Sequence, residues 1–162
     1  MSADIIGTVQ ALKPGEDLGA SPWLTVTQAM IDQFGAATLD PDPMHIDPDW
    51  ATKNGSFGGT IAFGFQTISL LTYFLHKVLE TQPGRDPAVH GHYLNYGFDK
   101  VRLVSPVKVG ARIRGHFRVG ERRQDDHGRW INTMESTIEI ENADRPALVG
   151  QWLSVWVPPD AS

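Results

Sequence analysis

The chain has 162 residues, 41% of them hydrophobic and 20% charged, the balance of one globular domain with one sizeable core. Its net charge of −5 disfavours nucleic-acid binding, and the absence of Cys excludes disulfides, zinc–thiolate sites and a thiol nucleophile. We expect a cytoplasmic protein, because Met1–Ile6 has no signal-peptide pattern. Residues 55–75 carry no charge but are diluted by Gly, Ser and Thr, which favours a buried helix over a membrane span.

The first half of the chain is predicted to be mainly helical. Thr25 or Thr27 can cap a helix that continues to Ala37, with apolar residues spaced by three and four. Pro41 must end this helix, because a residue that precedes proline avoids the helical conformation. The closely spaced prolines within Asp40–His45 predict a stiff, irregular connection that is neither regular helix nor central strand.

Two further helices are predicted before the strands begin. Asp47 as the cap and Pro48 in the first turn indicate the start of a short helix. A glycine-rich loop follows at residues 54–59, and Thr60 is predicted to open a long helix that ends near Glu80. This helix is apolar nearly all round, so we expect other elements to cover it.

The chain becomes mainly extended after Gly84. Between residues 112 and 119, apolar residues alternate with Arg and His, which predicts a strand with one solvated face. Further long strands are predicted at residues 90–104, 130–140 and 151–157. The sequence thus indicates an α+β fold, a single hot-dog domain over residues 1–162 in which a long antiparallel sheet wraps a central helix, with its core at about 20–157.

Asp40 and His45 are the first candidates for chemistry. They are five residues apart on the proline-stiffened segment, and a carboxylate near an imidazole can accept a proton from water and return one to a neighbouring carbon. The alternatives are that Asp40 only ends a helix and that His45 is an ordinary hydrogen-bonded residue. A calcium loop beginning at Asp40 would need Gly at its sixth and Glu at its twelfth position, where this chain has His45 and Ala51, so we expect no metal.

Gly64 is the second candidate. It lies near the predicted start of the long helix, where backbone N–H groups have no helical partner and the helix dipole is positive. These N–H groups suit the negative charge that builds on a thioester oxygen during hydration. Close packing of the helix against a sheet is the alternative reason for a glycine at this position.

Three segments in the same order resemble MaoC-like dehydratases and (R)-specific enoyl-CoA hydratases, particularly the branch that resembles nodulation protein N. Asp40–Asp47 is similar to the family's catalytic Asp-x-Asn-Pro-x-His-x-Asp segment, and Gly58–Leu71 to the Ile-Ala-His-Gly start of its central helix. Leu94–Arg102, followed by Ser105–Gly110, is similar to the next strand and turn. The resemblance extends from about residue 20 to residue 157.

The resemblance implies roles for particular residues. Asp40 and His45 would hold the catalytic water and exchange protons, and the Gly64 N–H would contact the thioester oxygen. Supporting roles would fall to a hydroxyl further along the helix and to the residue between the catalytic pair: Thr72, Ser69 and Asp42. The candidates for substrate contacts are Phe63, Phe65 and Gly59, and the alternative for the two aromatic residues is a place in the core. Phe63 replaces the family's usual His, and Asp42 replaces a frequent Asn.

The predicted function is therefore that of a lyase, a hydratase or dehydratase of fatty acid metabolism that adds water reversibly to a 2-enoyl thioester to give an (R)-3-hydroxyacyl thioester. The resemblance also implies a homodimer, an acyl-CoA or acyl-carrier substrate, and no metal or redox cofactor. We expect no nucleic-acid or membrane partner. The alternatives are a hot-dog thioesterase and a non-catalytic subunit that binds acyl thioesters.

Overall fold

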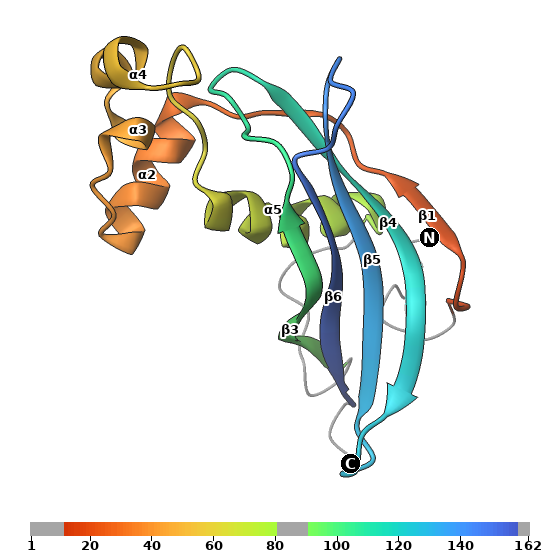
Figure 1. The fold of residues 1–162 in the computed structure, drawn as a ribbon. Helices are drawn as coiled ribbons and strands as arrows, with labels where there is room; N and C mark the ends of the chain where they lie inside the picture. Colours follow the sequence, from red (N-terminus) through yellow and green to blue (C-terminus); the bar gives the residue numbers. More distant parts are fainter. Residues whose placement is uncertain (1–11, 81–90, 159–162) are drawn as a thin grey trace.

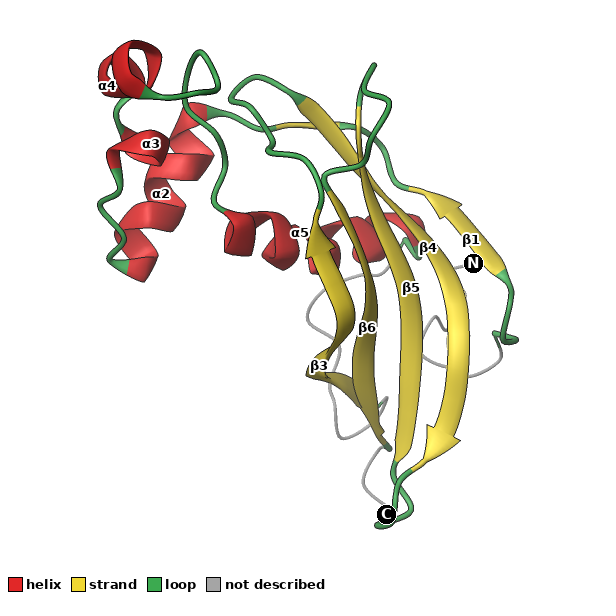
Figure 2. Ribbon diagram, viewed as in Figure 1, coloured by secondary structure: helices red, strands yellow, loops and turns green. Residues whose placement is uncertain are grey.

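The computed structural model describes residues 12–80 and 91–158 (Figures 1 and 2). Its elements in chain order are β1 (Asp17–Ala20), β2 (Leu24–Thr25), α2 (Gln28–Thr38), α3 (Pro43–Ile46), α4 (Pro48–Asn54), α5 (Gly64–Val78), β3 (His92–Leu103), β4 (Arg112–Gln124), β5 (Trp130–Ile140) and β6 (Leu148–Val157). The predictions for Met1–Ile6 and for a strand start at His90 lie outside the described residues. No helix among the described residues is long and apolar enough to cross a membrane.

The strands form one antiparallel sheet in the order β1-β4-β5-β6-β3, and β2 also pairs with β4. The four long strands overlap the four predicted ones, although β4 continues five residues beyond residue 119 and β6 begins three residues before residue 151. Strand β3 is at one edge of the sheet. Helix α5 runs across one face of the sheet, whereas α2, α3 and α4 lie beyond its end (Figure 1). We call these three helices, residues 28–54, the overhang.

The core lies between α5 and the curved sheet. Phe74 of α5 and Phe117 of β4 are fully buried there. A side chain at Gly115 would come within 2.6 Å of the Phe74 Cβ and within 2.8 Å of the Phe117 ring, so a glycine in β4 allows α5 to approach the sheet this closely.

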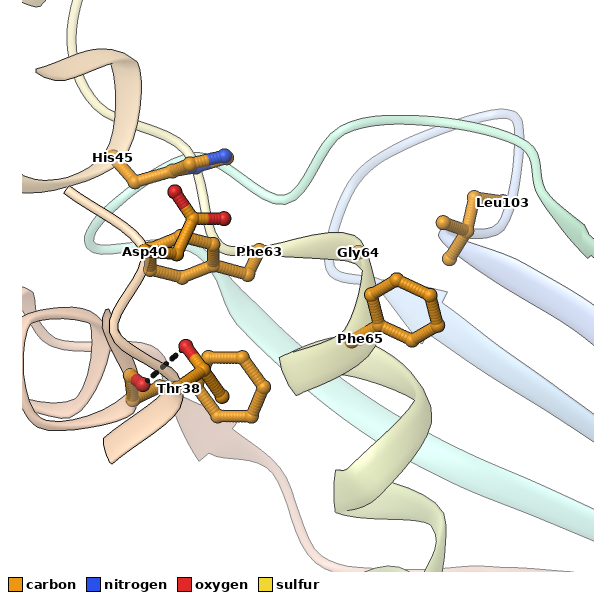
Figure 3. A pocket seen from close by; sticks show the side chains of 8 residues that line it. Thr38, Asp40, His45, Phe63, Gly64, Phe65 and Leu103 are labelled. Carbon is orange, nitrogen blue, oxygen red and sulfur yellow. Dashed lines mark hydrogen bonds between the residues drawn. The ribbon is translucent and has the colours of Figure 1, made fainter. Parts of the chain in front are cut away.

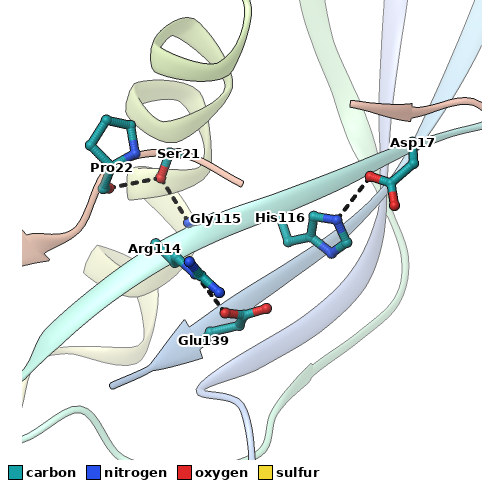
Figure 4. Close-up of polar contacts among 7 residues, drawn as sticks. All are labelled: Asp17, Ser21, Pro22, Arg114, Gly115, His116 and Glu139. Carbon is teal, nitrogen blue, oxygen red and sulfur yellow. Dashed lines mark hydrogen bonds and ion pairs between the residues drawn. The ribbon is translucent and has the colours of Figure 1, made fainter. Parts of the chain in front are cut away.

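Polar contacts fix the first strands against β4 (Figure 4). The Gly115 N–H donates to the Ser21 hydroxyl at 3.1 Å, and that hydroxyl donates to the Pro22 carbonyl at 3.0 Å. On the solvated face, Arg114 of β4 pairs with Glu139 of β5 at 2.7 Å. These cross-strand contacts follow from the predicted alternation of apolar and charged residues.

Helix α5 begins at Gly64, four residues later than predicted. Thr60 belongs instead to an extended segment: the Val109 N–H donates to its carbonyl at 3.0 Å, and the next residue, Ile61, forms an isolated bridge with Lys108. This pairing with a distant part of the chain replaces the first predicted turn of helix. Gly64 is consequently the first residue of α5.

Two other predictions need correction. Pro43 and His45 are helical, because Pro43 occupies the first turn of α3, where no N–H is needed, and Asp42 caps that helix. The expected cover of α5 by other elements is only partial in the single chain. The sheet covers one side of α5, and on the opposite side Phe65 is 76% exposed and Tyr73 is 41% exposed.

Candidate active site

Asp40 lies immediately after α2, where the chain leaves the helix. Leu39 has a left-handed conformation, with φ 58°, which ends α2 and turns the chain, and the Asp40 N–H donates to the Gly35 carbonyl at 3.0 Å. The Asp40 carboxylate accepts the N–H of Asp42 at 3.1 Å and is otherwise exposed. Its carboxylate points toward the ring of His45 (Figure 3).

His45 is buried, with 9% of its surface exposed, in the last turn of α3. Its ring nitrogen Nδ1 lies 2.7 Å from the Ile61 carbonyl oxygen. Because a carbonyl only accepts hydrogen bonds, Nδ1 carries the hydrogen in this contact, and Nε2 is then the accepting nitrogen of the neutral ring. Thr60, which was predicted to begin a helix, thus belongs to the extended segment whose Ile61 carbonyl orients the His45 ring.

Phe63 packs directly beneath Asp40 and His45. Its ring centroid lies 3.9 Å from that of His45 and 5.3 Å from that of Phe34. A Cβ at Gly35 would come within 3.0 Å of the Phe63 ring and 3.1 Å of the Asp40 carbonyl oxygen, so Gly35 makes room for this packing. Phe63 therefore supports the imidazole through ring contact and burial rather than through a hydrogen bond.

The N-terminus of α5 lies next to the pair. Phe63 is the N-cap residue and provides no side-chain hydrogen bond, so the first N–H groups of α5, beginning with Gly64, have no partner within the helix. These groups and the helix dipole favour a negatively charged oxygen. The Leu103 Cγ lies 3.8 Å from the position that a Cβ at Gly64 would occupy, and its Cδ1 would clash with that atom.

These groups converge on one cavity of about 380 Å³. Its lining combines one carboxylate, one imidazole and the start of a helix with mostly apolar walls: Phe34, Thr38, Asp40, His45, Phe63, Gly64, Phe65 and Leu103. Figure 3 shows Asp40 and His45 on one side and Gly64, Phe65 and Leu103 on the other. The structure thus brings together five of the predicted site residues, including the three that were predicted to be catalytic.

The other four predicted site residues do not line this cavity. Asp42 caps α3 by accepting the Met44 N–H at 2.9 Å, and Gly59 lies in the loop before α5 with φ 158°. Ser69 and Thr72 are exposed on α5, and the Ser69 hydroxyl donates to the Phe65 carbonyl at 2.8 Å. Among residues 12–80 and 91–158, no group of three or more His, Asp or Glu side chains is placed to hold a metal ion.

Sequence reasoning missed several residues that shape the site. Leu103 and Thr38 line the cavity, and Gly35 allows Phe63 to pack under His45. Gln28 does not line the cavity but is hydrogen-bonded to the His45 backbone at 2.8 Å. Leu103 is 58 residues or more from the rest of the cavity in sequence except for the start of α5, so no local pattern could reveal it.

Comparison with known proteins gives one consistent family. A family model described as "MaoC like domain" matches residues 9–143. Nodulation protein N of Rhizobium leguminosarum bv. viciae is 42% identical over 145 residues, which cover 87% of this chain and 84% of that protein. The 3-hydroxyacyl-thioester dehydratase Z of Mycobacterium tuberculosis (strain ATCC 25618 / H37Rv) is 37% identical over 141 residues, covering 87% and 89%.

Solved structures share the fold. A monoamine oxidase regulatory protein from Archaeoglobus fulgius superposes with a TM-score of 0.74 at 24% identity, covering 94% of each chain. An (R)-hydratase from A. caviae superposes with a TM-score of 0.69 at 22% identity, covering 90% of this chain and 97% of the other. The α+β hot-dog fold that the sequence predicted is confirmed by these likenesses.

Proposed function

This chain belongs to the MaoC-like dehydratase family, whose members are hydratases and dehydratases and hence lyases, and from that premise we propose that it adds water reversibly to a 2-enoyl thioester. The product would be the (R)-3-hydroxyacyl thioester. The observation that carries the proposal is that Asp40, His45 and the first residue of α5, Gly64, line one largely apolar cavity. This arrangement offers a proton-transfer pair opposite a site for a developing negative charge.

In the hydration direction, the Asp40 carboxylate and His45 Nε2 hold one water molecule. The water loses a proton to the pair while its oxygen bonds to C3 of the enoyl group. The double-bond electrons move toward the thioester, whose oxygen gains negative charge next to the Gly64 N–H. A proton from the pair then bonds to C2, so the sum of the steps is the addition of H₂O. The bond from Nδ1 to Ile61 keeps Nε2 available for this exchange.

The apolar walls suit the acyl part of the substrate. Phe63 and Phe65 were predicted to contact substrate, and both line the cavity beside Leu103. The reaction transfers no electrons, so the proposal requires no redox cofactor, and proton transfer by Asp40 and His45 requires no metal. The thioester carrier in this proposal is CoA or an acyl carrier, and the reaction takes place in the cytoplasm.

The proposed assembly is a homodimer formed through the edge strand β3. An edge strand exposes unpaired backbone groups, and Leu94 and Tyr96 of β3 are 52% and 53% exposed. Phe65 and Tyr73 on the open side of α5 are also exposed and apolar, so a second copy could cover them as well. Sedimentation of the purified protein should therefore give twice the 17.9 kDa of one chain, and a monomer at micromolar concentration would contradict the dimer.

Thr72 gains a role only in such an assembly. It lies eight residues after Gly64, about 12 Å along the helix axis, and does not line the cavity of its own chain. The support for the catalytic pair that we predict from Thr72 would therefore have to be given to the cavity of a second copy.

The test is the loss of enoyl-thioester absorbance when the protein is mixed with crotonyl-CoA or with a longer 2-enoyl-CoA. We expect loss with the wild type and almost none with His45→Ala. Free thiol is measured in the same samples, because release of CoA would indicate a thioesterase instead. If neither substrate reacts and no thiol is released, the hydratase proposal is wrong for these substrates and a binding subunit becomes the better hypothesis.

A further inference from the structure

Gln28, the first residue of α2, uses its whole side-chain amide to connect separate segments of the chain. Its Nε2 donates to the Asp32 carboxylate at 2.8 Å and to the His45 carbonyl at 2.8 Å. Its Oε1 accepts the Thr60 hydroxyl at 2.5 Å. Both amide hydrogens and the amide oxygen are therefore engaged, which fixes the orientation of the amide plane.

Each of the two long-range bonds satisfies a group that the local structure leaves unpaired. Helix α3 has only four residues, so the His45 carbonyl near its end accepts no hydrogen bond from an N–H group of the same helix. Thr60 is 1% exposed, and a buried hydroxyl needs a hydrogen-bond partner. Gln28 meets both requirements at once, so one side chain joins α3 to the extended segment that precedes α5.

These bonds close a ring of contacts around the catalytic histidine. The His45 ring donates from Nδ1 to the Ile61 carbonyl at 2.7 Å, while its backbone carbonyl is held by Gln28. Gln28 in turn holds Thr60, the neighbour of Ile61. The Gln28 amide thus holds both the backbone of His45 and the segment whose Ile61 carbonyl sets the tautomer of the His45 ring.

We propose that Gln28 is a positioning residue that sets the orientation and the tautomer of His45 toward Asp40 and Gly64. This inference rests on the proposed function. Gln28 acts through other residues, because it does not line the cavity. It stands at the start of the helix that leads to Asp40, and it bonds to the residue that lies four positions before Gly64. Its bonds therefore couple the positions of all three catalytic groups.

The experiment compares three variants that remove different bonds of this amide. Gln28→Met keeps the length of the side chain but removes all three bonds. Thr60→Val removes only the bond from the Thr60 hydroxyl. Asp32→Ala removes only the bond on the exposed side of α2 and is the matched control, because it leaves the bonds to His45 and Thr60 in place.

The first readout is steady-state hydration of a 2-enoyl-CoA. We expect kcat to fall about 30- to 100-fold in Gln28→Met with KM changed less than about threefold, because a misplaced catalytic group slows the chemical step more than it weakens binding. Thr60→Val should give a smaller loss of about 3- to 10-fold, and Asp32→Ala should stay within about twofold of the wild type.

The second readout does not depend on activity. Long-range ¹H–¹⁵N NMR of the imidazoles reports which ring nitrogen carries the hydrogen, and His45→Ala identifies the signals of His45. We expect the wild type and Asp32→Ala to carry the hydrogen on Nδ1, and Gln28→Met to show a mixture of tautomers. Circular dichroism and the thermal midpoint report whether each variant is folded.

The two proposals fail in different ways. If the wild type hydrates enoyl-CoA and Gln28→Met keeps both its kcat and the Nδ1 tautomer, the positioning role is wrong and the hydratase proposal stands. If the wild type hydrates nothing but Gln28→Met still changes the tautomer, the positioning role stands and the hydratase proposal is wrong. Should Gln28→Met unfold, Thr60→Val provides the same two readouts, and an unchanged kcat and tautomer in that variant would overturn the inference.

Discussion

The overhang and the sheet are held together by different interactions. Within the overhang, the residues in helices that are buried are few, namely Ile31, Gly35, His45 and Ala51. Its short helices depend on side-chain caps from Thr27, Asp42 and Asp47. The layer of α5 and the sheet instead buries large apolar side chains completely, including Leu71, Phe74, Ile113, Phe117, Ile138 and Leu148.

This difference separates stability from chemistry. Burial of large apolar groups provides most of the free energy of folding, so the sheet and α5 should dominate the stability of the protein. Two of the three proposed catalytic groups, Asp40 and His45, belong to the overhang, where polar contacts determine position but contribute about 1 kcal/mol each. Substitutions in the two regions should therefore affect different measurements.

The largest effect on activity is expected from Asp40→Asn. The amide keeps the shape of the side chain and can still accept the Asp42 N–H, but it cannot accept a proton from water. We expect kcat to fall about 1,000-fold, within the range for loss of a general acid–base group, with a thermal midpoint within about 2 °C of the wild type.

Asp49→Asn is the control for this prediction, because it makes the same exchange at an exposed position of the first turn of α4. That variant should keep full turnover of enoyl-CoA. Retention of more than a tenth of kcat by Asp40→Asn would remove Asp40 from the mechanism.

The opposite behaviour is expected for Phe117→Ala in β4. Phe117 is fully buried, and replacing it with Ala should lower the free energy of unfolding by about 3–5 kcal/mol, because the substitution leaves a cavity. The kcat of the molecules that remain folded should stay within about threefold of the wild type. Urea unfolding measures the first quantity, and enoyl-CoA hydration at low temperature measures the second.

Val109→Ala is the comparison for this loss of stability, because Val109 is 37% exposed and its truncation should cost less than about 1 kcal/mol. A Phe117→Ala variant as stable as Val109→Ala would show that the sheet does not dominate stability. A loss of kcat as large as that of Asp40→Asn would show that the two regions are not separable.

The same contrast explains which features the sequence revealed. The strands β4 and β5 were predictable because a sheet with one solvated face imposes an alternation that is visible along the chain. Strands β1 and β2 have four and two residues and produce no such pattern. The start of α5 was misplaced because Ile61 pairs with Lys108, a contact between residues 47 positions apart.

The candidate site was predictable for a different reason. Asp40 and His45 lie on one short segment, and Gly64 lies near a helix start, so the chemistry of each was visible locally. The roles of Leu103 and Gln28 were not visible in the sequence. Leu103 reaches the site only because β3 ends near the start of α5, and Gln28 contacts His45 only because α2 packs against α3. Burial of Phe117 could be predicted from the alternation in β4. Exposure of one side of α5 could not, because it depends on how the helix and the sheet pack in three dimensions.

Leu103 allows a finer test, since it is a residue of the sheet that reaches the site. Its side chain covers Gly64 and is 53% exposed, so Leu103→Ala should enlarge the cavity without a large loss of stability. We expect the ratio of kcat/KM for a long over a short 2-enoyl-CoA to rise about 5- to 10-fold, the effect of a few methylene groups in an apolar site.

Val109→Ala also serves as the control here, because Val109 is 37% exposed, lies outside the proposed dimer surface and does not line the cavity. Its ratio of kcat/KM values should equal that of the wild type. An unchanged ratio in Leu103→Ala would mean that the acyl group leaves the cavity by another side.

The smallest effect is expected from the polar surface of the sheet, at Asp17 of β1. The Asp17 carboxylate accepts the Gly19 N–H at 2.8 Å and lies 2.9 Å from His116 Nε2, and these contacts lower the pKa of Asp17 below its ordinary value of 3.8 (Figure 4). Because folding lowers this pKa, the carboxylate stabilises the fold above pH 4, and this contribution is lost as the pH falls through the pKa of the folded state. The thermal midpoint of Asp17→Asn should therefore lie slightly below that of the wild type at pH 5, and the two midpoints should converge toward pH 2.

A difference between the two midpoints that stays constant or widens on acidification would contradict the role of the charge. A gap at pH 5 as large as that caused by Phe117→Ala would mean that polar contacts stabilise the sheet as strongly as apolar burial does.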